Sequence, residues 1–379
     1  MKSEKGKRAG QTHLISIFAD MEDHRIDRTK AHSVENIVFI TLAAVLCGAD
    51  TWTEIERFGH RKRDWFAQHL DLSNGIPSHD TLNRFFSTLD SDVFEKHFRK
   101  WASEISPATA GSVIHLDGKT IRGSRSLGKS AIHMVSAWSN DAGISLGQIR
   151  TDEKSNEITA IPELLEAIMV RGMVVTIDAM GCQENIVNHI VDAGGDYVIA
   201  VKQNQPQLFE DIADSFRAMG GRPGEFNGSV VVHDDFGHGR IETRTVTVLT
   251  DLSLIDKIER WAGAQSIVRV DAQRIQKATG EVETATRYYI SSLPADAGRH
   301  AHIIRSHWSI ENNLHWCLDV CMGEDADRKR NENAVINFSL IRKIALTILR
   351  DPSTGKSSIQ VKRKEAGWDN SYLSLLMKI

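Results

Sequence analysis

Cysteine and proline are scarce in this sequence, and a long apolar run is missing. The 379 residues include four cysteines and seven prolines. The cysteines form no CxxC pair and predict no disulfide framework, so a reducing cytoplasm is the simplest setting. The longest apolar stretch, residues 37–47, has about eleven residues and contains Thr41, whereas a helix that spans a bilayer needs about twenty. Residues 1–10 are basic and polar with no apolar segment after them, so neither a secretory signal nor a membrane span is expected.

Charge of one sign is not in large excess over the whole chain, but basic residues are concentrated locally. The formal net charge is −4, which by itself argues weakly against a nucleic-acid partner. Residues 328–379, however, contain eleven Lys or Arg against four Asp or Glu. Lys119, Arg122, Arg125 and Lys129 form a second basic run without an acid. Such runs are usually solvated faces, yet they are also compatible with a polyanion that lies along one side of the protein.

The first hundred residues are typical of a helical domain. Helical periodicity and capping signals predict helices at residues 32–47, 51–58, 62–69 and 92–105. Ser78 is a good start signal for a further short helix, on which Asn83 and Arg84 would be exposed. Two short helices here could form a helix-turn-helix that reads DNA. A plain helical bundle is the alternative that we favour, because Asp80 and Asp90 flank the supposed recognition helix.

Strand patterns begin after residue 111. Apolar runs predict strands at residues 112–117, 131–139, 143–151, 173–178 and 196–201, and the segments 157–170 and 183–193 predict helices. Three antiparallel strands followed by alternating helices and strands describe an α/β fold with a mixed sheet and helices on its faces. Further strand patterns with polar turns between residues 203 and 292 indicate a β-rich insertion.

These patterns divide the chain into five segments. Residues 1–105 are expected to form a helical N-terminal domain, which is a candidate for binding DNA ends. Residues 111–202 form the first part of the sheet core, and residues 203–292 form the insertion. Residues 293–350 complete the core with a long helix, and residues 351–379 form a basic, loosely packed tail. The core is therefore expected to be assembled from two segments that the insertion separates.

The long helix is predicted at residues 302–330, where apolar residues recur at helical spacing. One of its sides combines apolar, imidazole and carboxylate groups, because three- and four-residue steps join Ile304, His307, Trp308, Glu311 and His315. A single Glu on such a helix usually faces solvent at the edge of a core stripe. Aromatic residues at helical spacing usually belong to a core, although Trp308 and Trp316 could also stack on an unpaired base.

Two strand-like runs each end on an aspartate, Asp117 and Asp178. Side chains at neighbouring strand ends can converge, and α/β sheets usually place their functional sites there. Two close carboxylates repel each other, so both ionise only if cations lie between them, and oxygen ligands favour Mg²⁺ or Mn²⁺. With Glu311, three acids could hold two metal ions for phosphoryl transfer. Strand-terminal aspartates alone are weak evidence, because many of them cap helices or form turns.

The flanking sequences resemble a known family. The resemblance is carried by HLDGKTIRGS at 115–124, TDEKSNEITAIPELL at 151–165, TIDAMGCQ at 176–183, GGDYVIAVKQNQ at 194–205, HGRIETR at 238–244, RYYISS at 287–292 and HWSIENNLHWCLDVCMGED at 307–325. These segments are similar to bacterial insertion-sequence transposases with a DDE motif, and most of all to the H-repeat-associated proteins of Rhs elements in the ISAs-type transposase family. The resemblance implies a ribonuclease H-like core with a β-rich insertion before the third acid. Its acid triad falls on Asp117, Asp178 and Glu311.

The resemblance implies a DNA transposase that uses two Mg²⁺ or Mn²⁺ ions, with the three acids as catalytic and metal-binding residues. Such an enzyme hydrolyses a phosphodiester at each element end and then joins the freed 3′-hydroxyl to target DNA. The implied partners are element ends and target DNA, in a homodimer or larger assembly at the nucleoid in the bacterial cytoplasm and away from membranes. Two alternatives stay open: a metal-dependent nuclease that cuts without joining, and a non-catalytic DNA-binding remnant of a mobile element.

The surroundings of the third acid depart from the family pattern. Related DDE enzymes carry a Tyr, an Arg and a Lys there, where this chain has Ile304, His307 and Leu318. His307 could partly replace the Arg in gripping the DNA strand beside the cut. A zinc site built from His315, Cys317 and Cys321 is disfavoured, because the first two of these side chains diverge on a helix.

Other residues are candidates for DNA contacts. Lys119 and Arg122 could hold phosphates, which position DNA without reading its sequence, or they could lie in an exposed loop. Two further candidates, Lys202 and Asn204, follow the last predicted strand of the sheet. The insertion contributes three more: His238, Arg240 and Arg244. Their alternating spacing is equally compatible with the polar face of a strand.

Overall fold

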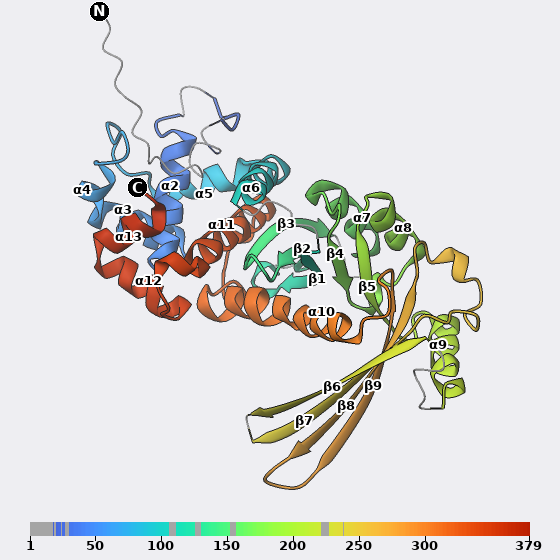
Figure 1. Ribbon diagram of the computed structural model, residues 1–379. Helices are drawn as coiled ribbons and strands as arrows, with labels where there is room; N and C mark the ends of the chain where they lie inside the picture. Colours follow the sequence, from blue (N-terminus) through green and yellow to red (C-terminus); the bar gives the residue numbers. More distant parts are fainter. Residues whose placement is uncertain are drawn as a thin grey trace, which may run out of the picture.

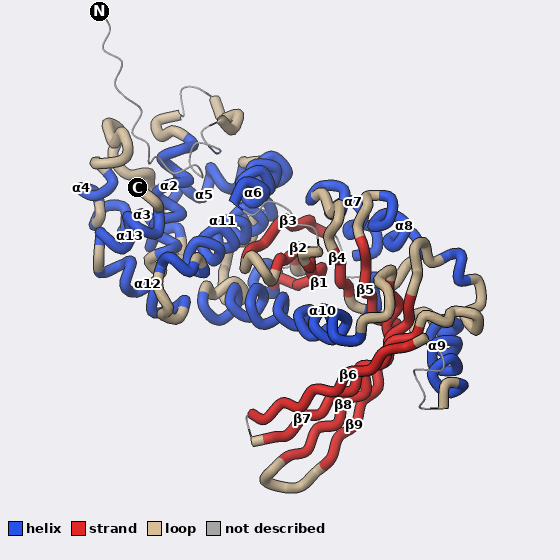
Figure 2. Tube along the Cα trace, in the orientation of Figure 1, coloured by secondary structure: helices blue, strands red, loops and turns tan. Residues whose placement is uncertain are grey.

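The structure is a computed structural model that describes residues 18, 20–23, 25–26, 30–105, 111–125, 130–151, 157–220, 227–237 and 239–379. Helices from both ends of the chain gather on one side of a mixed sheet, and a long β-arm projects from the other side (Figure 1). Figure 2 shows that this arm continues the strands of the central sheet. No helix within the described ranges is long and apolar enough to cross a membrane.

The N-terminal helices begin where the sequence offers side-chain caps. Ser33, Thr51 and Ser78 each accept a hydrogen bond from a first-turn backbone N–H, and Thr51 belongs to a full capping box. Gly48, with φ at +92°, ends the first of these helices. The helices are α2 (Val34–Leu46), α3 (Trp52–Arg61), α4 (Arg63–Phe66), α5 (His79–Thr88) and α6 (Ser91–Ile105).

The central sheet contains the three antiparallel and two parallel strands that the sequence predicts. Its strands are β1 (Val113–Ile121), β2 (Ile132–Ser139), β3 (Ile144–Thr151), β4 (Val174–Ile177) and β5 (Asp196–Val201). β1, β2 and β3 pair antiparallel, whereas β1, β4 and β5 pair parallel through the helices α7 (Glu157–Ile168) and α8 (Glu184–Asp192). The predicted mixed sheet flanked by helices, with a helical N-terminal region, is confirmed.

The β-rich segment extends this sheet instead of forming a separate unit. Its strands are β6 (Gly228–Gly237), β7 (Arg240–Leu249), β8 (Ser266–Gln276) and β9 (Val282–Ser291). β9 pairs antiparallel with β5, so one sheet of nine strands results, in the order β3-β2-β1-β4-β5-β9-β8-β7-β6. The segment also starts with a helix that the sequence analysis missed, α9 (Pro206–Ala218). The available signals were Pro206 at the first turn and apolar residues at helical spacing.

The helix that carries the third acid is shorter and less regular than predicted. α10 (Ala297–Ser309) continues into two π-helical segments, Ile310–His315 and Cys317–Cys321. The helical run ends before Gly323, which has φ at +62°, so the predicted extension to residue 330 is wrong. Gly323 was the signal in the sequence that marks this stop.

The C-terminal segment is not a loosely packed tail. After α11 (Glu332–Arg350), the chain forms α12 (Ile359–Trp368) and α13 (Asn370–Met377). Leu373 and Leu376 are buried, and the Arg363 guanidinium donates to the Val45 carbonyl and to the Asp50 carboxylate. The basic residues of this region therefore include some that hold the C-terminal helices to α2 and its loop.

Two large apolar cores stabilise different parts of the described structure. One lies between the sheet and the helices α7 and α8. The other unites the N-terminal helices with α11, α12 and α13, and it also contains Ile310, Leu314 and Leu318 of the π-helical segments. The third acid is therefore anchored to the helical region as well as to the sheet, although these parts are far apart in the sequence.

Candidate active site

The two aspartates lie side by side because of the parallel register of β1 and β4. The last parallel pair is Leu116 with Ile177, and Asp117 and Asp178 follow it on the two strands. The expectation that Asp117 ends its strand is only half right, because β1 continues to Ile121 in antiparallel pairing with β2. The pairing of β1 with β4 ends at Leu116. Beyond this pair the two strands are no longer hydrogen-bonded to each other, and the two carboxylates lie there.

Backbone N–H groups orient both carboxylates. Asp178 caps the short helical turn Ala179–Gly181 and accepts a hydrogen bond from the Met180 N–H at 2.9 Å. The Asn204 amide donates to the Ala179 carbonyl at 2.6 Å and so secures the same turn from the end of β5. Asp117 accepts from the Gly118 N–H, also at 2.9 Å. Each carboxylate is thus oriented by a backbone N–H that binds its Oδ1 oxygen.

Glu311 approaches the aspartates from the helix that covers the opposite face of the sheet from α7 and α8. It is exposed and lies in the π-helical segment Ile310–His315, in which its carbonyl accepts from the N–H of Trp316, five residues on. Nδ1 of His315, on the same segment, lies 3.4 Å from Oδ2 of Asp117. π-Helical insertions are often found at functional sites, because they change the direction of the side chains on a helix.

The three acids share one electrostatic environment. The pKa of Asp117 is raised to about 7, mainly by burial and also by the Asp178, Glu311 and Glu157 carboxylates, against the lowering effect of the Gly118 hydrogen bond. Across the described ranges, however, no three His, Cys, Asp or Glu side chains lie close enough together to ligate one metal ion. The acids are neighbours, but their carboxylates are not gathered at a single point.

A hydrogen-bonded chain that the sequence analysis missed lies beneath the acids. Oγ1 of Thr176 is 2.7 Å from Nδ1 of His115 and 2.8 Å from Nδ1 of His307. Burial lowers the pKa of His115 to about 3 and that of His307 to about 4, so both imidazoles are neutral at physiological pH. The spacing in the sequence already related these residues to the acids. His115 and Thr176 each precede an aspartate by two positions, and His307 precedes Glu311 by four.

A second pair of polar residues lies against the backbone next to Asp117. His133 and Glu157 are joined by an Nε2–Oε1 contact of 2.6 Å. A Cβ atom placed on Gly118 would lie 2.2 Å from Oε1 of Glu157 and 2.5 Å from Nε2 of His133. Glycine is therefore needed at position 118, because β1 passes directly over this buried pair.

Family comparisons agree with this geometry. A family model described as the transposase DDE domain matches residues 108–348, and one described as DDE_Tnp_1-associated matches residues 15–102. The chain belongs to the DDE transposase family. It is 42% identical over 364 residues to "Putative transposase YncI" of Escherichia coli O157:H7, covering 95% of this chain and 93% of that relative. It is 38% identical over 368 residues to "H repeat-associated putative transposase YhhI" of Escherichia coli K12, covering 96% and 97%.

Among solved structures, this DDE transposase is similar to one described as the piggyBac transposase synaptic complex with hairpin DNA. The TM-score is 0.47 with 12% sequence identity, over 96% of this chain and 78% of that one. The family match makes the chain a member of a class of enzymes that transfer polynucleotides. The resemblance to the DDE and H-repeat-associated transposases predicted from the sequence is confirmed.

The Lys119 ammonium forms ion pairs with carboxylates of the transposase itself. Its ammonium lies 2.7 Å from Asp319, 2.6 Å from Glu324 and 3.5 Å from Asp325, and its side chain is only 10% exposed. Although burial alone would raise the pKa of Glu324, Lys119 and Arg342 lower it to about 2. Lys119 therefore lies in a strand and not in an exposed loop. Its charge joins β1 to the segment after the π-helix.

The other predicted DNA contacts are distributed over the molecule. Arg122 is exposed beside Asp325, and Lys202 is exposed at the carboxyl end of β5. Arg240 is exposed at the tip of the β-arm, and Arg244 pairs with Glu242. The Asn204 amide nitrogen and Nδ1 of His307 bind within the protein, as described above, and His238 lies outside the described residues. Arg122 follows β1 and Lys202 follows β5, and both side chains are exposed.

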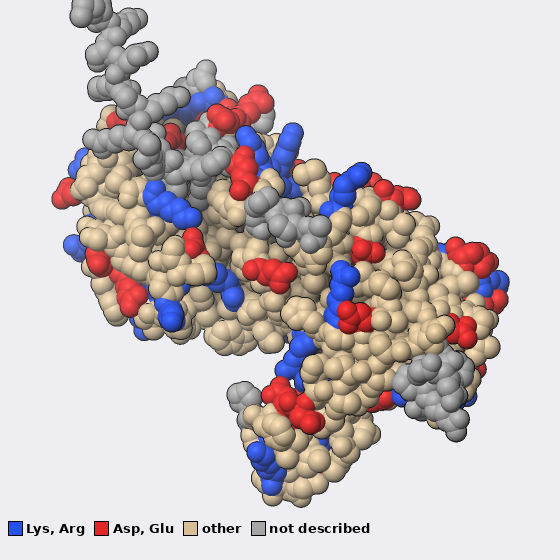
Figure 3. All heavy atoms as spheres, in the orientation of Figure 1, with Lys and Arg blue, Asp and Glu red and all other residues tan. Residues whose placement is uncertain are grey.

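The helix of the third acid also displays aromatic residues that were expected in a core. Trp308 is 50% exposed and Trp316 is 54% exposed. Both lie on the side of the helix away from the buried Ile310 and Leu314, so they face solvent. On the face shown in Figure 3, basic and acidic side chains are interspersed and form no single basic patch.

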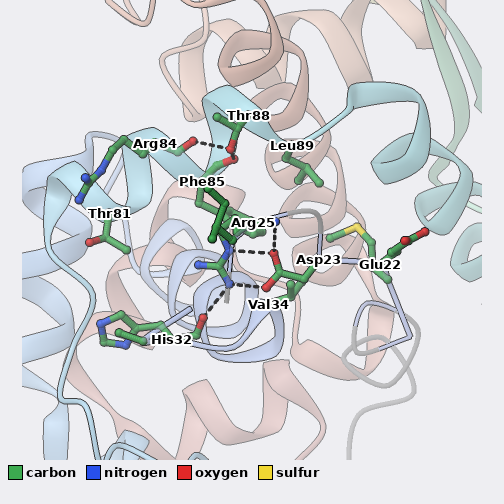
Figure 4. A pocket seen from close by; sticks show the side chains of 13 residues that line it. Glu22, Asp23, Arg25, His32, Val34, Thr81, Arg84, Phe85, Thr88 and Leu89 are labelled. Carbon is green, nitrogen blue, oxygen red and sulfur yellow. Dashed lines mark hydrogen bonds and ion pairs between the residues drawn. The ribbon is translucent and has the colours of Figure 1, made fainter. Parts of the chain in front are cut away.

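Hollows also lie outside the acid site. A pocket of about 570 Å³ in the helical region is lined by Arg25, whose guanidinium already binds Asp23 and the His32 carbonyl and lies over Phe85 (Figure 4). A larger groove of about 880 Å³ runs between α3, α5 and the loop before α11, and Arg328 and Arg330 are exposed along it. None of the three acids lines either hollow.

Proposed function

We propose that this chain is a DNA transposase that cuts the ends of a mobile element and joins them to target DNA, with Asp117, Asp178 and Glu311 as its catalytic acids. One observation carries the proposal. An aspartate follows the last parallel pair on both β1 and β4, and the helix-borne Glu311 acts electrostatically on one of these two aspartates. In a DDE transposase, phosphodiester transfer is the reaction that such an acid set would serve.

The donor set fits a pair of divalent cations. Three carboxylates offer the oxygen ligands that Mg²⁺ and Mn²⁺ prefer. The raised pKa of Asp117 reflects a surplus of negative charge around a buried carboxyl group, and a nearby cation would offset this surplus. When bound, two such ions would activate the water or hydroxyl oxygen that attacks the phosphodiester and stabilise the oxygen that leaves. Glu311 is exposed, and we propose that its carboxylate joins the two aspartates when the ions bind.

The chain's own residues would orient the acids and hold the DNA. Hydrogen bonds from Met180 and Gly118 keep Asp178 and Asp117 in place. Because β4 and β5 are parallel, Lys202 lies at the same sheet edge as Asp178 and can contact a phosphate there. Arg122 is placed for the same task beyond Asp117. Trp308 and Trp316 offer exposed rings on which a base could stack.

The partners that fit this proposal are element ends and target DNA. The groove with Arg328 and Arg330 supports a path for a duplex along the helical region, and Arg240 would contact DNA farther away. Two ends must be held at once, so we propose a homodimer or larger assembly that works at the bacterial nucleoid in the cytoplasm. The proposed chemistry requires no covalent link between protein and DNA.

The test uses DNA that carries the sequences flanking the gene, with Mg²⁺ or Mn²⁺ added. Asp178→Asn removes the charge but can still cap the turn at Met180, so the fold is preserved. Asp141→Asn, in the exposed turn between β2 and β3, is the matched control. We expect the first variant to lose cleavage and joining by orders of magnitude while it still binds DNA, and the second to retain both.

Each outcome has a distinct meaning. Full activity of the Asp178→Asn variant rejects the acid assignment. A second substrate with pre-cut 3′-hydroxyl ends separates joining from cutting, because a nuclease would leave these ends unjoined. Absence of metal-dependent nicking by the wild-type protein would instead favour a non-catalytic DNA-binding protein.

A further inference from the structure

The three elements that carry the acids are connected by one hydroxyl group. Thr176 belongs to β4, and its Oγ1 lies within hydrogen-bond distance of Nδ1 of His115 on β1 and of Nδ1 of His307 on α10. The two imidazole rings meet edge to face, with their centroids 5.7 Å apart. His115 is fully buried and Thr176 is 3% exposed. The triplet of His115, Thr176 and His307 is therefore centred on buried side chains and is not a surface contact.

The spacing places each member of the triplet directly beneath an acid. Side chains two residues apart in a strand share a face, so His115 lies below Asp117 and Thr176 lies below Asp178. Side chains four residues apart in a helix also share a face, which relates His307 to Glu311. The alternate strand residues, such as Leu116 and Ile177, belong to the core on the opposite side. The triplet and the acids thus form two successive layers on one face of the sheet.

Only side chains can define where the helix stands relative to the strands. β1 and β4 are joined by backbone hydrogen bonds in a fixed register, whereas α10 is joined to these two strands by no such backbone ladder. Apolar contacts of Ile303 with Val113 and Val174 hold the helix against the sheet, but such contacts are not directional. The contact between Thr176 and His307 is directional, and it lies one helical turn from Glu311.

We propose that His115, Thr176 and His307 are positioning residues that fix the helix so that Glu311 can join Asp117 and Asp178 at a divalent cation. This inference rests on the proposed function. The Thr176 hydroxyl has one hydrogen and two lone pairs, so it can donate to one imidazole and accept from the other. None of the three residues touches the reacting atoms in this proposal; they act by orienting the acids, as outer-shell hydrogen bonds orient the ligands of metal sites.

The test compares Thr176→Val, which keeps the shape of the side chain but removes the hydroxyl, with Thr176→Ser, which keeps the hydroxyl. Mn²⁺ binding is measured by the loss of the free-ion electron paramagnetic resonance signal, and DNA binding is measured separately in EDTA. We expect Thr176→Val to weaken Mn²⁺ binding by about 10- to 100-fold, as for other outer-shell partners of metal ligands. Thr176→Ser should stay close to the wild type, and DNA binding in EDTA should stay unchanged in both.

A kinetic measurement gives a second readout. At a fixed Mn²⁺ concentration, Thr176→Val should lower kcat of DNA cleavage and leave KM for DNA unchanged, because the DNA-binding surface is intact. If Thr176→Val fails to fold, His307→Leu and His307→Asn replace it, since the Asn amide can occupy the place of Nδ1. We then expect His307→Asn to bind Mn²⁺ more tightly than His307→Leu.

The outcomes separate this inference from the proposed function. Equal Mn²⁺ affinity of wild type and Thr176→Val overturns the positioning role, as does an equal loss in Thr176→Ser and Thr176→Val. Equal loss in the two His307 variants has the same meaning. If Asp178→Asn binds Mn²⁺ as tightly as the wild type, the proposed acid site itself is wrong, whatever the Thr176 variants show.

Discussion

The two strand-borne acids and the helix-borne acid are held by different kinds of interaction. Asp117 and Asp178 stand on adjacent parallel strands, where backbone hydrogen bonds define the register to the residue. Glu311 depends on side chains: Leu314 is buried in the helical core, and His307 reaches Thr176 on the sheet. A strand pair therefore brings two acids together locally, whereas the third acid needs a second core and polar contacts across the fold.

The largest expected effect comes from removing the buried ion pair between Lys119 on β1 and Glu324 in the segment after the π-helix. Lys119→Met leaves the buried Glu324 without its nearest cation, and removing one partner of such a pair costs about 3–5 kcal/mol of stability. Because the pKa of Glu324 is lowered from 4.5 to about 2, its stabilisation is present above pH 4.5 and is lost as the pH falls toward 2. The free energy of unfolding of Lys119→Met should therefore differ most from that of the wild type at neutral pH. The difference should become smaller in acid.

Urea unfolding at pH 7 and pH 4 measures this difference. Arg122→Met is the control, because the Arg122 side chain is 83% exposed and its pairing with Asp325 is loose. A cost for Lys119→Met no larger than that of the control would mean that the buried pair does not join β1 to the segment after the π-helix.

A second change weakens only the packing of the helix-borne acid. Leu314 is fully buried in the helical core, so Leu314→Ala should lower the free energy of unfolding by about 3 kcal/mol. Val320→Ala on the same helical run is the control, because Val320 is 49% exposed and should change stability by less than about 0.5 kcal/mol. Equal effects in thermal or urea unfolding would contradict the packing described for this helix.

A third change acts on the strand-borne side. Gly118→Ala places a methyl group against the buried pair of His133 and Glu157, and overpacking of this kind costs about 1–3 kcal/mol. It should also displace Asp117 and reduce DNA cleavage. Gly237→Ala is the matched control in a strand, because no atom lies within 4 Å of the added carbon. Wild-type stability of the Gly118→Ala protein would mean that the neighbouring pair moves aside freely.

The smallest effect is expected at the tip of the arm. Arg240 is exposed, so Arg240→Ala should change stability by less than about 0.5 kcal/mol. If Arg240 contacts a phosphate, the variant should bind DNA more weakly, with a salt dependence reduced by about one ionic contact. Fluorescence anisotropy with labelled DNA at several salt concentrations measures both quantities, and an unchanged salt dependence would remove Arg240 from the DNA surface.

Local sequence signals predicted helices and strands, whereas contacts between segments that are distant in the sequence were missed. Ser78 caps a helix whose start was predicted from this same residue, because a cap involves only its own first turn. By contrast, the pairing of β9 with β5 and the packing of the C-terminal helices against α2 depend on contacts between distant segments. Periodicity reports which face of an element is apolar, but it does not identify the partner that covers this face.

The candidate site shows the same division. The three acids were predicted because their flanking segments resemble a known family, since strand-terminal aspartates alone are weak evidence. The occupation of Lys119 by three carboxylates, the π-helical setting of Glu311 and the contact of Thr176 with both imidazoles were decided by the tertiary structure. The physical reason is that a sequence specifies which groups are available, whereas their protonation, exposure and partners depend on which other segments fold against them.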